Sequence, residues 1–562
     1  MAAIAALAIA WALIMHGMGW AQESNYAQVR ALAHGKAEID QYQWETKDKA
    51  WMQGHFYAVK APGLAIFTLP AYLLADAAGK GLVKGAVANA ERADTLHWGG
   101  MPAPPYAEAG FSAKRAWHAS AEDRLSAPVI WFLMLFGALL PALIMLLLVR
   151  RLGDVIEPGL GTAAAVTLGL CTMLMTFASE YFSHVMAATL VFGAFALLYR
   201  ERQGEPRPWL TALAGLLAGL AVTFEYPLGL VGVVLFAYAL SRDHLRLPRA
   251  AAYAGGALLG ALPVLAFNQW AFGSPLEFAY SNAVAVQGFD GHAVLGLNSA
   301  GFFGITSPKP SAAVDLLFSS RGLLTITPVI AMAVAGAIAM RRSLHRAEAN
   351  VILAVAAVYF AYNCGYWLPF GGGTPGPRFL IPTLPFLGLG LATAWKRWPA
   401  LTLGLAIPSA VFMIPATITL PLIGDNGTSV WGDRVISGEF ENTLLTALGV
   451  HNGWYAITPV LVGCVLAVWF AARATPALDW GRAPAWFVLG PVALWGAVSA
   501  VGPTVAGDHY TPISHGETSL EIIGVGAVTA FLTLVLLRYR GRRLAPAPGG
   551  AAPVPVAVGE SS

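Results

Sequence analysis

Long apolar runs alternate with short polar segments along most of the 562-residue chain. Many runs are close to 20 residues, the length of helix that crosses roughly 30 Å of hydrocarbon. We expect an all-α polytopic membrane protein, a bundle of about 14 transmembrane helices. The expected spans are residues 1–20, 128–149, 160–178, 184–199, 208–224, 227–241, 249–269, 322–340, 349–367, 378–394, 400–423, 454–472, 484–504 and 519–537.

The composition supports the membrane assignment. Hydrophobic residues make up 57% of the chain and charged residues only 12%, whereas soluble domains carry about 25% charged residues. The formal net charge of +3 is small, and the basic residues form no single block, which argues against nucleic acid as a partner. The histidines, cysteines and carboxylates show no metal-ligand spacing, so we expect neither a metal nor a cofactor.

The basic residues give the expected orientation. More than half of the 34 lysines and arginines fall in short segments that follow alternate spans. Such segments usually face the cytoplasm, which would place both termini there. The residues concerned are Arg150, Arg151, Arg200, Arg202, Arg207, Arg242, Arg246, Arg249, Arg341, Arg342, Arg346, Lys396, Arg397, Arg473, Arg482, Arg538, Arg540, Arg542 and Arg543.

One apolar run, residues 63–78, conflicts with this orientation if it crosses the membrane, because every later loop would then be inverted. It is short for a span, and Pro70 interrupts it. We therefore expect a helix along, or dipping into, the outer membrane face. Residues 21–127 then form one long extracytoplasmic loop, with an interfacial helix that is capped by Ser24 or Asn25 and ends at Gly35.

Polar residues of this first loop are candidates for chemistry. Glu23, Asp40 and Asp48 could accept a proton, and Lys60 precedes the apolar run, where it could meet a lipid phosphate. The competing interpretation is that they are solvated loop residues and that the lysine reaches toward lipid headgroups. His55 and Tyr57 belong to the same stretch, GHFYAVKAPG, which covers residues 54–63.

Three residues in later outer turns are further candidates. Glu225 lies between two apolar spans, where a carboxylate is costly and usually has a function. Arg378 follows the flexible stretch GGGTPGP and could bind a phosphate through two hydrogen bonds. His184 could bind a sugar or act as a base, although a histidine satisfied at a helix end is the commoner case.

Four motifs resemble those of the GT-C glycosyltransferases, in particular the bacterial family 39 type that includes lipid A aminoarabinose transferases and protein O-mannosyltransferases. They are GHFYAVKAPG, the stretch Arg321-Gly322-Leu323-Leu324 with Pro328, GGGTPGPR, and FLIPTLPF at residues 379–386. The resemblance covers roughly residues 1–395. Two positions depart from the family pattern: Gln22-Glu23 stands where the family commonly has Asp-Glu, and Ser183-His184 where some members carry an aspartate.

The resemblance implies transfer of a sugar from a polyprenyl-phosphate carrier to a cell-envelope glycan, lipid or protein on the outer face of the bacterial inner membrane. Direct displacement would invert the anomeric configuration. By resemblance the donor phosphate would be held by Lys60, with His55 and Arg378 as additional donors. Glu23 would be the nearest substitute for the missing base, followed by Asp40 and Asp48. Substrate contacts would come from Tyr57, His184 and Glu225.

The expected organisation is a catalytic membrane module over residues 1–395, further C-terminal spans over 396–543 with an outer loop at 424–453, and a disordered cytoplasmic tail over 544–562. A flippase or transporter of lipid-linked sugar is one alternative, but few charges lie inside the spans and no internal repeat is visible. A non-catalytic sugar-lipid binding protein is the other, and Gln22 favours it.

Overall fold

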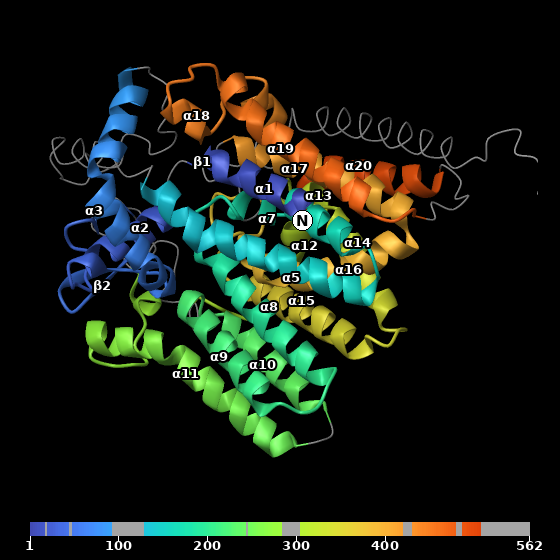
Figure 1. The fold of residues 1–562 in the computed structure, drawn as a ribbon, viewed down its shortest axis with the longest axis horizontal. Coiled ribbons are helices and arrows are strands. Elements are labelled where there is room, and N and C mark those ends of the chain that lie inside the picture. The colour runs from blue at the N-terminus through green and yellow to red at the C-terminus, as the bar shows by residue number, and fades with distance from the viewer. Residues whose placement is uncertain are drawn as a thin grey trace, which may run out of the picture.

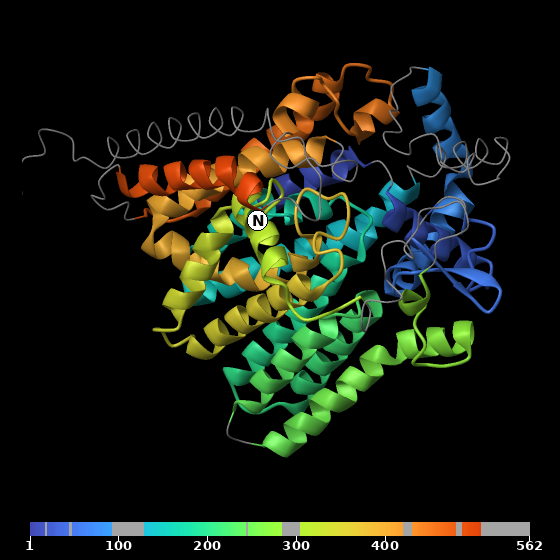
Figure 2. The same cartoon turned by 180° about the vertical axis from the view of Figure 1, so that it is seen from behind.

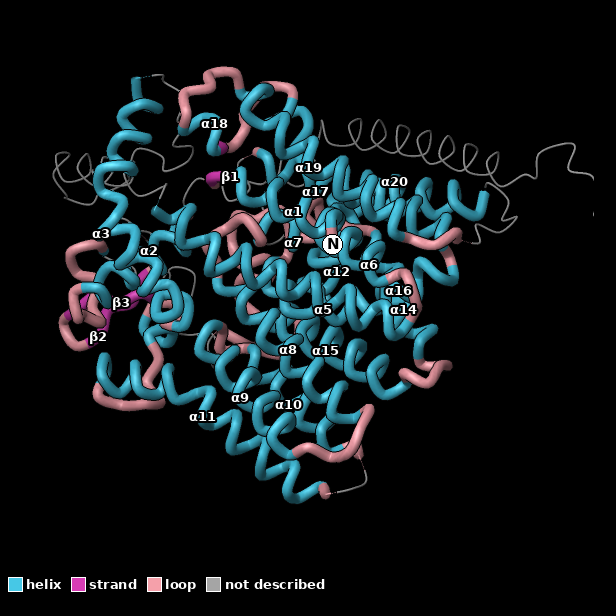
Figure 3. Tube along the Cα trace, viewed as in Figure 1, coloured by secondary structure: helices cyan, strands magenta, loops and turns pink. Residues whose placement is uncertain are grey.

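The computed structural model describes residues 1–16, 19–43, 46, 48–92, 129–242, 245–283, 304–419, 430–478 and 486–506. Over these residues the chain is a helical bundle with only two small two-stranded sheets, as Figures 1 and 3 show. The strands are β1 (Ile14–Met15), which pairs with β4 (Asn442–Thr443), and β2 (Lys49–Met52), which pairs with β3 (His55–Ala58).

The helices follow the expected apolar runs. In chain order they are α1 (Ala2–Leu13), α2 (Trp20–Ala33), α3 (Gly63–Arg92), η3 (Leu135–Leu139), α5 (Leu140–Ile156), α6 (Gly161–Cys171), α7 (Leu174–Phe177), α8 (Ser183–Arg202), α9 (Pro208–Phe224), α10 (Leu228–Leu240), α11 (Arg246–Phe272), η4 (Ala279–Asn282), α12 (Pro310–Phe318), α13 (Leu323–Ile326), α14 (Val329–Met340), α15 (Arg346–Gly365), η6 (Arg378–Thr383), α16 (Leu384–Arg397), α17 (Pro399–Ile418), η7 (Trp431–Val435), α18 (Leu444–Ala447), α19 (Gly453–Ala474) and α20 (Trp486–Ala506).

Among the described residues, seven helices are long and apolar enough to cross a membrane, and a bent pair at Pro310–Ile326 and Val329–Met340 would make eight. Shorter apolar helices occupy other expected spans, among them α1, α6, α9 and α10. The expected all-α polytopic membrane fold is confirmed. The expected span at 519–537 and the tail at 544–562 lie outside the described residues.

Several helix boundaries differ from the expectation. Helix α3, expected over residues 63–78, runs from Gly63 to Arg92. Helix α1 ends at Leu13 rather than near residue 20, because Ile14 and Met15 leave the helix to pair with Thr443 and Asn442. This pairing joins the N-terminal segment to a segment more than 400 residues later, which a local hydropathy pattern does not encode. Helix α2 starts at Trp20 with Gly19 as its N-cap, so Ser24 and Asn25 lie inside it.

The chain after α2 forms a hairpin that leads directly to Lys60. The turn between β2 and β3 places Gln53 at φ 52° and Gly54 at φ 86°, the pair of positive values that suits a two-residue hairpin. Trp51 and Phe56 face each other across the strands, with ring centroids 4.5 Å apart. Figure 2 shows the hairpin beside one end of α11.

Helices α9 and α11 pack closely because each carries two glycines four residues apart. A Cβ atom on Gly215 of α9 would lie 2.0 Å from the carbonyl oxygen of Tyr253, and one on Gly256 of α11 would lie 2.0 Å from that of Ala212. Only glycine fits at these two positions, as is typical of helix pairs inside membranes.

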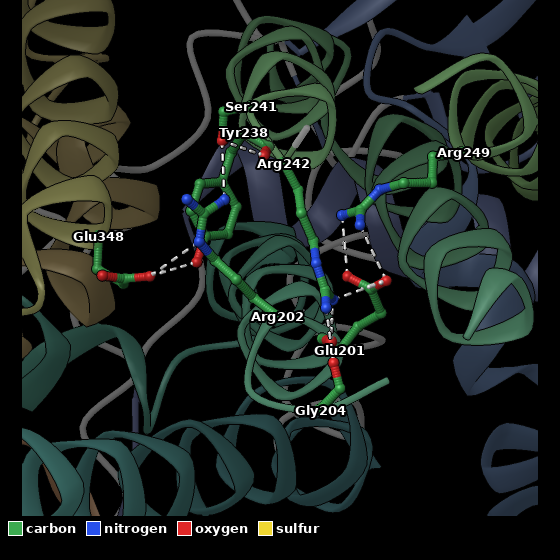
Figure 4. Close-up of polar contacts among 8 residues, drawn as sticks. All are labelled: Glu201, Arg202, Gly204, Tyr238, Ser241, Arg242, Arg249 and Glu348. Carbon is green, nitrogen blue, oxygen red and sulfur yellow. Dashed lines mark hydrogen bonds and ion pairs between the residues drawn. The ribbon is translucent and has the colours of Figure 1, made fainter. Parts of the chain in front are cut away.

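The ends of α8, α10, α11 and α15 meet in a network of polar and charged side chains (Figure 4). We call it the helix-end cluster; its members are Glu201, Arg202, Tyr238, Arg242, Arg249 and Glu348. Arg249 Nη1 donates to Oε1 of Glu201 over 3.0 Å, and its Nη2 atom lies 2.9 Å from Oε2 in an ion pair. Both side chains are almost fully buried. Tyr238 donates to Glu348 over 2.6 Å. Arg242 caps carbonyl oxygens at the end of α8. The helix-end cluster therefore ties four helices together.

Candidate functional site

A cavity of about 320 Å³ lies at the opposite end of α8 from the helix-end cluster. Helix α8 is 20 residues long, so the two regions are about 30 Å apart along its axis. The cavity is bordered by the start of α8, the turn between α9 and α10, the segment after β3, and η6. It therefore lies on the side away from Arg202, Arg242 and Arg249, as the charge pattern predicts for an outer site.

Lys60 lines this cavity. Its Nζ atom is 2.8 Å from Oδ2 of Asp48, and the two side chains are 19% and 11% exposed. Asp48 is held in place by Ser24 of α2, whose hydroxyl donates to the Asp48 carbonyl oxygen over 2.6 Å. The hairpin thus returns the chain so that Lys60 and Asp48, 12 residues apart in sequence, form an ion pair at the cavity.

Arg378 also lines the cavity and is 9% exposed. Its guanidinium carbon lies 5.1 Å from the centre of the Phe182 ring and 5.4 Å from that of Phe379. The preceding glycine-rich loop is held by Arg321, which donates to the carbonyl oxygens of Gly372 and Thr374 at 3.0 and 2.9 Å. The two arginines of the resembling motifs therefore have different positions: Arg378 meets the cavity, and Arg321 supports the loop.

Glu225 and His184 form a pair on another wall of the cavity. Oε1 of Glu225 is 3.0 Å from Nδ1 of His184, and the Ser183 hydroxyl donates to the same oxygen. Burial alone would raise the pKa of Glu225. The charge and hydrogen bonds of His184 and Ser183, with the charge of Lys60, outweigh burial and hold that pKa below its usual value.

Aromatic side chains complete the lining. Phe182, Tyr280, Tyr362 and Phe379 contribute to it, and Tyr280 is hydrogen-bonded through its hydroxyl to that of Tyr366. Sequence reasoning did not single out these residues. Their positions come from four separate segments, and an aromatic residue beside an apolar run carries no local signal of facing a cavity.

The other expected site residues lie outside the lining. Asp40 accepts from the Phe56 amide and from His55, whose Nδ1 is 2.7 Å from Asp40 Oδ2 in an exposed contact. Tyr57 donates to the Ala271 carbonyl oxygen over 3.3 Å and so attaches the hairpin to α11. Glu23 is fully buried within α2.

A second buried polar cluster lies at the turn before α8. His16 Nδ1 is 3.5 Å from Glu180 and 3.4 Å from Glu441, and the Gln22 amide donates to Glu180, 158 residues away in sequence. Burial raises the pKa of Glu180 to about 8. Sequence reasoning missed this cluster. Gln22 is at one of the two positions where the sequence departs from the pattern of the family it resembles, and the carboxylate of Glu180, from another segment, accepts a hydrogen bond from it.

No metal-binding group of three or more histidine, cysteine or carboxylate side chains occurs in the described part of the chain. The cavity instead brings together two basic side chains, Lys60 and Arg378, with the Glu225–His184 pair and aromatic walls. Such a lining can hold an anion at the cations while apolar or flat groups contact the rings.

Comparisons with known proteins give little direct guidance. No protein-family model and no curated protein matches this chain. Among solved structures, it is similar to the crystal structure of ArnT from Cupriavidus metallidurans bound to undecaprenyl phosphate, with 14% sequence identity and a TM-score of 0.45. The match covers 95% of this chain and 76% of the other. Such values do not indicate which residues act, so a function has to be inferred from the cavity itself.

Proposed function

We propose that this protein is a glycosyltransferase that moves a sugar from a polyprenyl-phosphate carrier to an acceptor hydroxyl on the outer face of the membrane. The observation that carries the proposal is the cavity, which both Lys60 and Arg378 line together with aromatic side chains. It lies at the opposite end of α8 from the helix-end cluster. The same two residues belong to the motifs GHFYAVKAPG and GGGTPGPR, which resemble those of GT-C glycosyltransferases.

The chemistry requires positive charge more than an acid. The leaving group of such a donor is a lipid phosphate, which departs already ionised and gains negative charge as the bond from its oxygen to the sugar C1 atom breaks. Cations fixed beside that oxygen stabilise the transition state more than the ground state. Lys60 is held by Asp48, and Arg378 by its position between two aromatic rings, so both would be in place before the donor binds.

The proposal is tested by lipid binding and by transfer. Undecaprenyl phosphate is titrated into the purified full chain in nanodiscs, for the wild type and for Lys60→Ala. Loss of one charge-assisted hydrogen bond corresponds to about 1.5–3 kcal/mol, so we expect binding to weaken by about 10- to 100-fold. Transfer from a panel of undecaprenyl-phosphate hexoses and pentoses should fall as well.

Lys36→Ala is the matched control. Lys36 belongs to the same outer region, but its side chain is 55% exposed and pairs with Glu38 at 3.5 Å, outside the cavity lining. This variant should bind and turn over as the wild type does. Equal binding by all three proteins would overturn the proposed phosphate site, and binding without transfer from any donor of the panel would favour a sugar-lipid binding protein.

A further inference from the structure

Glu225 is the one carboxylate among the described residues that line the cavity. It directly follows α9 and has an extended backbone, with φ −148° and ψ 110°, which turns the chain out of the helix before α10 begins. Asp48, Asp40 and Glu23, the carboxylates expected from the sequence to supply the base, do not border the cavity. Asp48 is moreover paired with Lys60.

The two oxygens of Glu225 are in different situations. Oε1 accepts from the Ser183 hydroxyl and contacts His184 Nδ1 at 3.0 Å. Oε2 takes part in no hydrogen bond or ion pair that the structure describes, and the side chain is 16% exposed. One oxygen is thus anchored while the other is left available to a molecule in the cavity.

We propose that Glu225 is the general base of the transfer reaction, a catalytic residue that accepts the proton of the acceptor hydroxyl. This inference rests on the proposed function. In the step, the hydroxyl oxygen bonds to the sugar C1 atom and its proton passes to Oε2 of Glu225. The bond from C1 to the phosphate oxygen breaks, and its electron pair leaves with the polyprenyl phosphate, held by Lys60 and Arg378.

His184 and Ser183 are positioning residues for this base. The imidazole of His184 stacks on Phe182, with ring centroids 5.7 Å apart and planes 16° from parallel, and meets the edge of Phe379 at 5.6 Å. The ring is therefore fixed, and with it the direction of the Glu225 carboxylate.

The charge state of Glu225 suits a general base. Because the contacts with His184, Ser183 and Lys60 keep the pKa of Glu225 below its usual value despite burial, the carboxylate is ionised at neutral pH. A carboxylate with a low pKa is a weak base. It is sufficient here because the hydroxyl becomes strongly acidic as its oxygen bonds to C1.

The first test uses Glu225→Gln, which keeps the shape of the side chain and an oxygen for Ser183. Release of undecaprenyl phosphate from undecaprenyl-phosphate sugars is measured in nanodiscs, with a total cell-envelope extract as the source of acceptor hydroxyls, alongside binding of undecaprenyl phosphate. Loss of a general base lowers kcat by about 10²- to 10⁴-fold, while lipid binding should change by less than about threefold. Glu38→Gln, which removes a carboxylate outside the lining, should keep wild-type kcat.

The second test uses His184→Phe and the pH profile of kcat. Phenylalanine fits among the surrounding aromatic rings but cannot bond Glu225. Without the charge and hydrogen bond of His184, which lower the pKa of Glu225 against the effect of burial, that pKa rises and the acid limb of the profile moves to higher pH. A merely structural loss would lower kcat at every pH without moving that limb.

The outcomes separate the two proposals. If Glu225→Gln keeps the kcat of a wild type that turns over, the assignment of the base is wrong and the proposed function stands. If the acid limb of the pH profile of His184→Phe does not move, the assignment of the base is likewise wrong and the proposed function is unaffected. If the wild type releases no undecaprenyl phosphate and Lys60→Ala binds that lipid normally, the proposed function itself is wrong.

Discussion

The helix-end cluster and the cavity use the same kinds of side chain at opposite ends of α8, with different results. In the helix-end cluster, Arg249 and Glu201 are 2% and 1% exposed and are joined by one hydrogen bond and one ion pair. At the cavity, within the described parts of the chain, Lys60 has one carboxylate partner, and Glu225 has one oxygen engaged and one available. Charged side chains that are buried against each other join helices, whereas charged side chains that line a cavity can bind a ligand.

The energetic consequences also differ. Removing one member of a buried ion pair leaves an uncompensated charge in a medium that solvates it poorly. A charged side chain beside a cavity stays partly accessible to water. Its removal should therefore lower the free energy of unfolding less than the loss of a buried pair does, and should weaken ligand binding more. The pair in the helix-end cluster should therefore control unfolding, and the cavity residues should control lipid binding.

The largest expected effect is on the helix-end cluster. In Arg249→Ala the buried Glu201 keeps the longer contact with Arg242, at 3.5 Å, but loses both contacts with Arg249. The free energy of unfolding should therefore fall by about 3 kcal/mol, the low end for a broken buried ion pair. The measurement is unfolding of the purified protein by SDS in mixed micelles. Arg341→Ala, at an exposed position after α14, is the control and should stay within about 0.5 kcal/mol of the wild type. Similar losses in both variants would show that the pair does not join the helices.

A smaller effect is expected in the glycine-rich loop. Gly371 has φ 80°, and a Cβ atom there would lie 2.6 Å from Nε of Arg378. Gly371→Ala should cost about 1–2 kcal/mol of stability through backbone strain and weaken undecaprenyl phosphate binding by displacing Arg378. Gly372 has φ 111° but open space around its Cβ position, so Gly372→Ala should add strain without the loss of binding. Equal binding by the two variants would argue against a role for Arg378.

The stability cost of Lys60→Ala should be smaller still. The side chains of Lys60 and Asp48 are 19% and 11% exposed, more than those of Arg249 and Glu201, so the expected loss is about 1 kcal/mol, well below that for Arg249→Ala. SDS unfolding of the two variants under the same conditions gives the comparison. A loss for Lys60→Ala as large as that for Arg249→Ala would mean that the cavity charges serve the fold, as the helix-end cluster does.

The smallest effect concerns the exposed pair of His55 and Asp40. The hydrogen bond and charge of Asp40 raise the pKa of His55, so this contact adds stability at low pH and ceases to do so as pH rises through the raised value. In Asp40→Asn the pKa of His55 should fall toward 6.5, as followed by NMR titration. Lipid binding is a second readout, and a change there would place this pair at the site after all.

Local patterns accounted for most of the fold. Hydropathy located the helices, since the need to bury backbone polar groups in lipid acts on each segment separately. It also indicated that Ser183-His184 at the start of α8, Glu225 after α9 and Arg378 in η6, just before α16, would lie at one side. The basic residues gather at the other ends of the same helices. Gly35, at φ 72°, ends α2 as expected from its tolerance of positive φ.

Pairing between distant segments could not be predicted from these patterns. The contacts of Asp40 with His55, of Gln22 with Glu180, and of β1 with β4 depend on how separate segments meet. The same holds for the closely packed glycines of α9 and α11. The sequence by itself determined which side chains could carry charge in the segments between the apolar runs. Only the tertiary structure decided which of them share a cavity, because that depends on contacts between residues far apart in the chain.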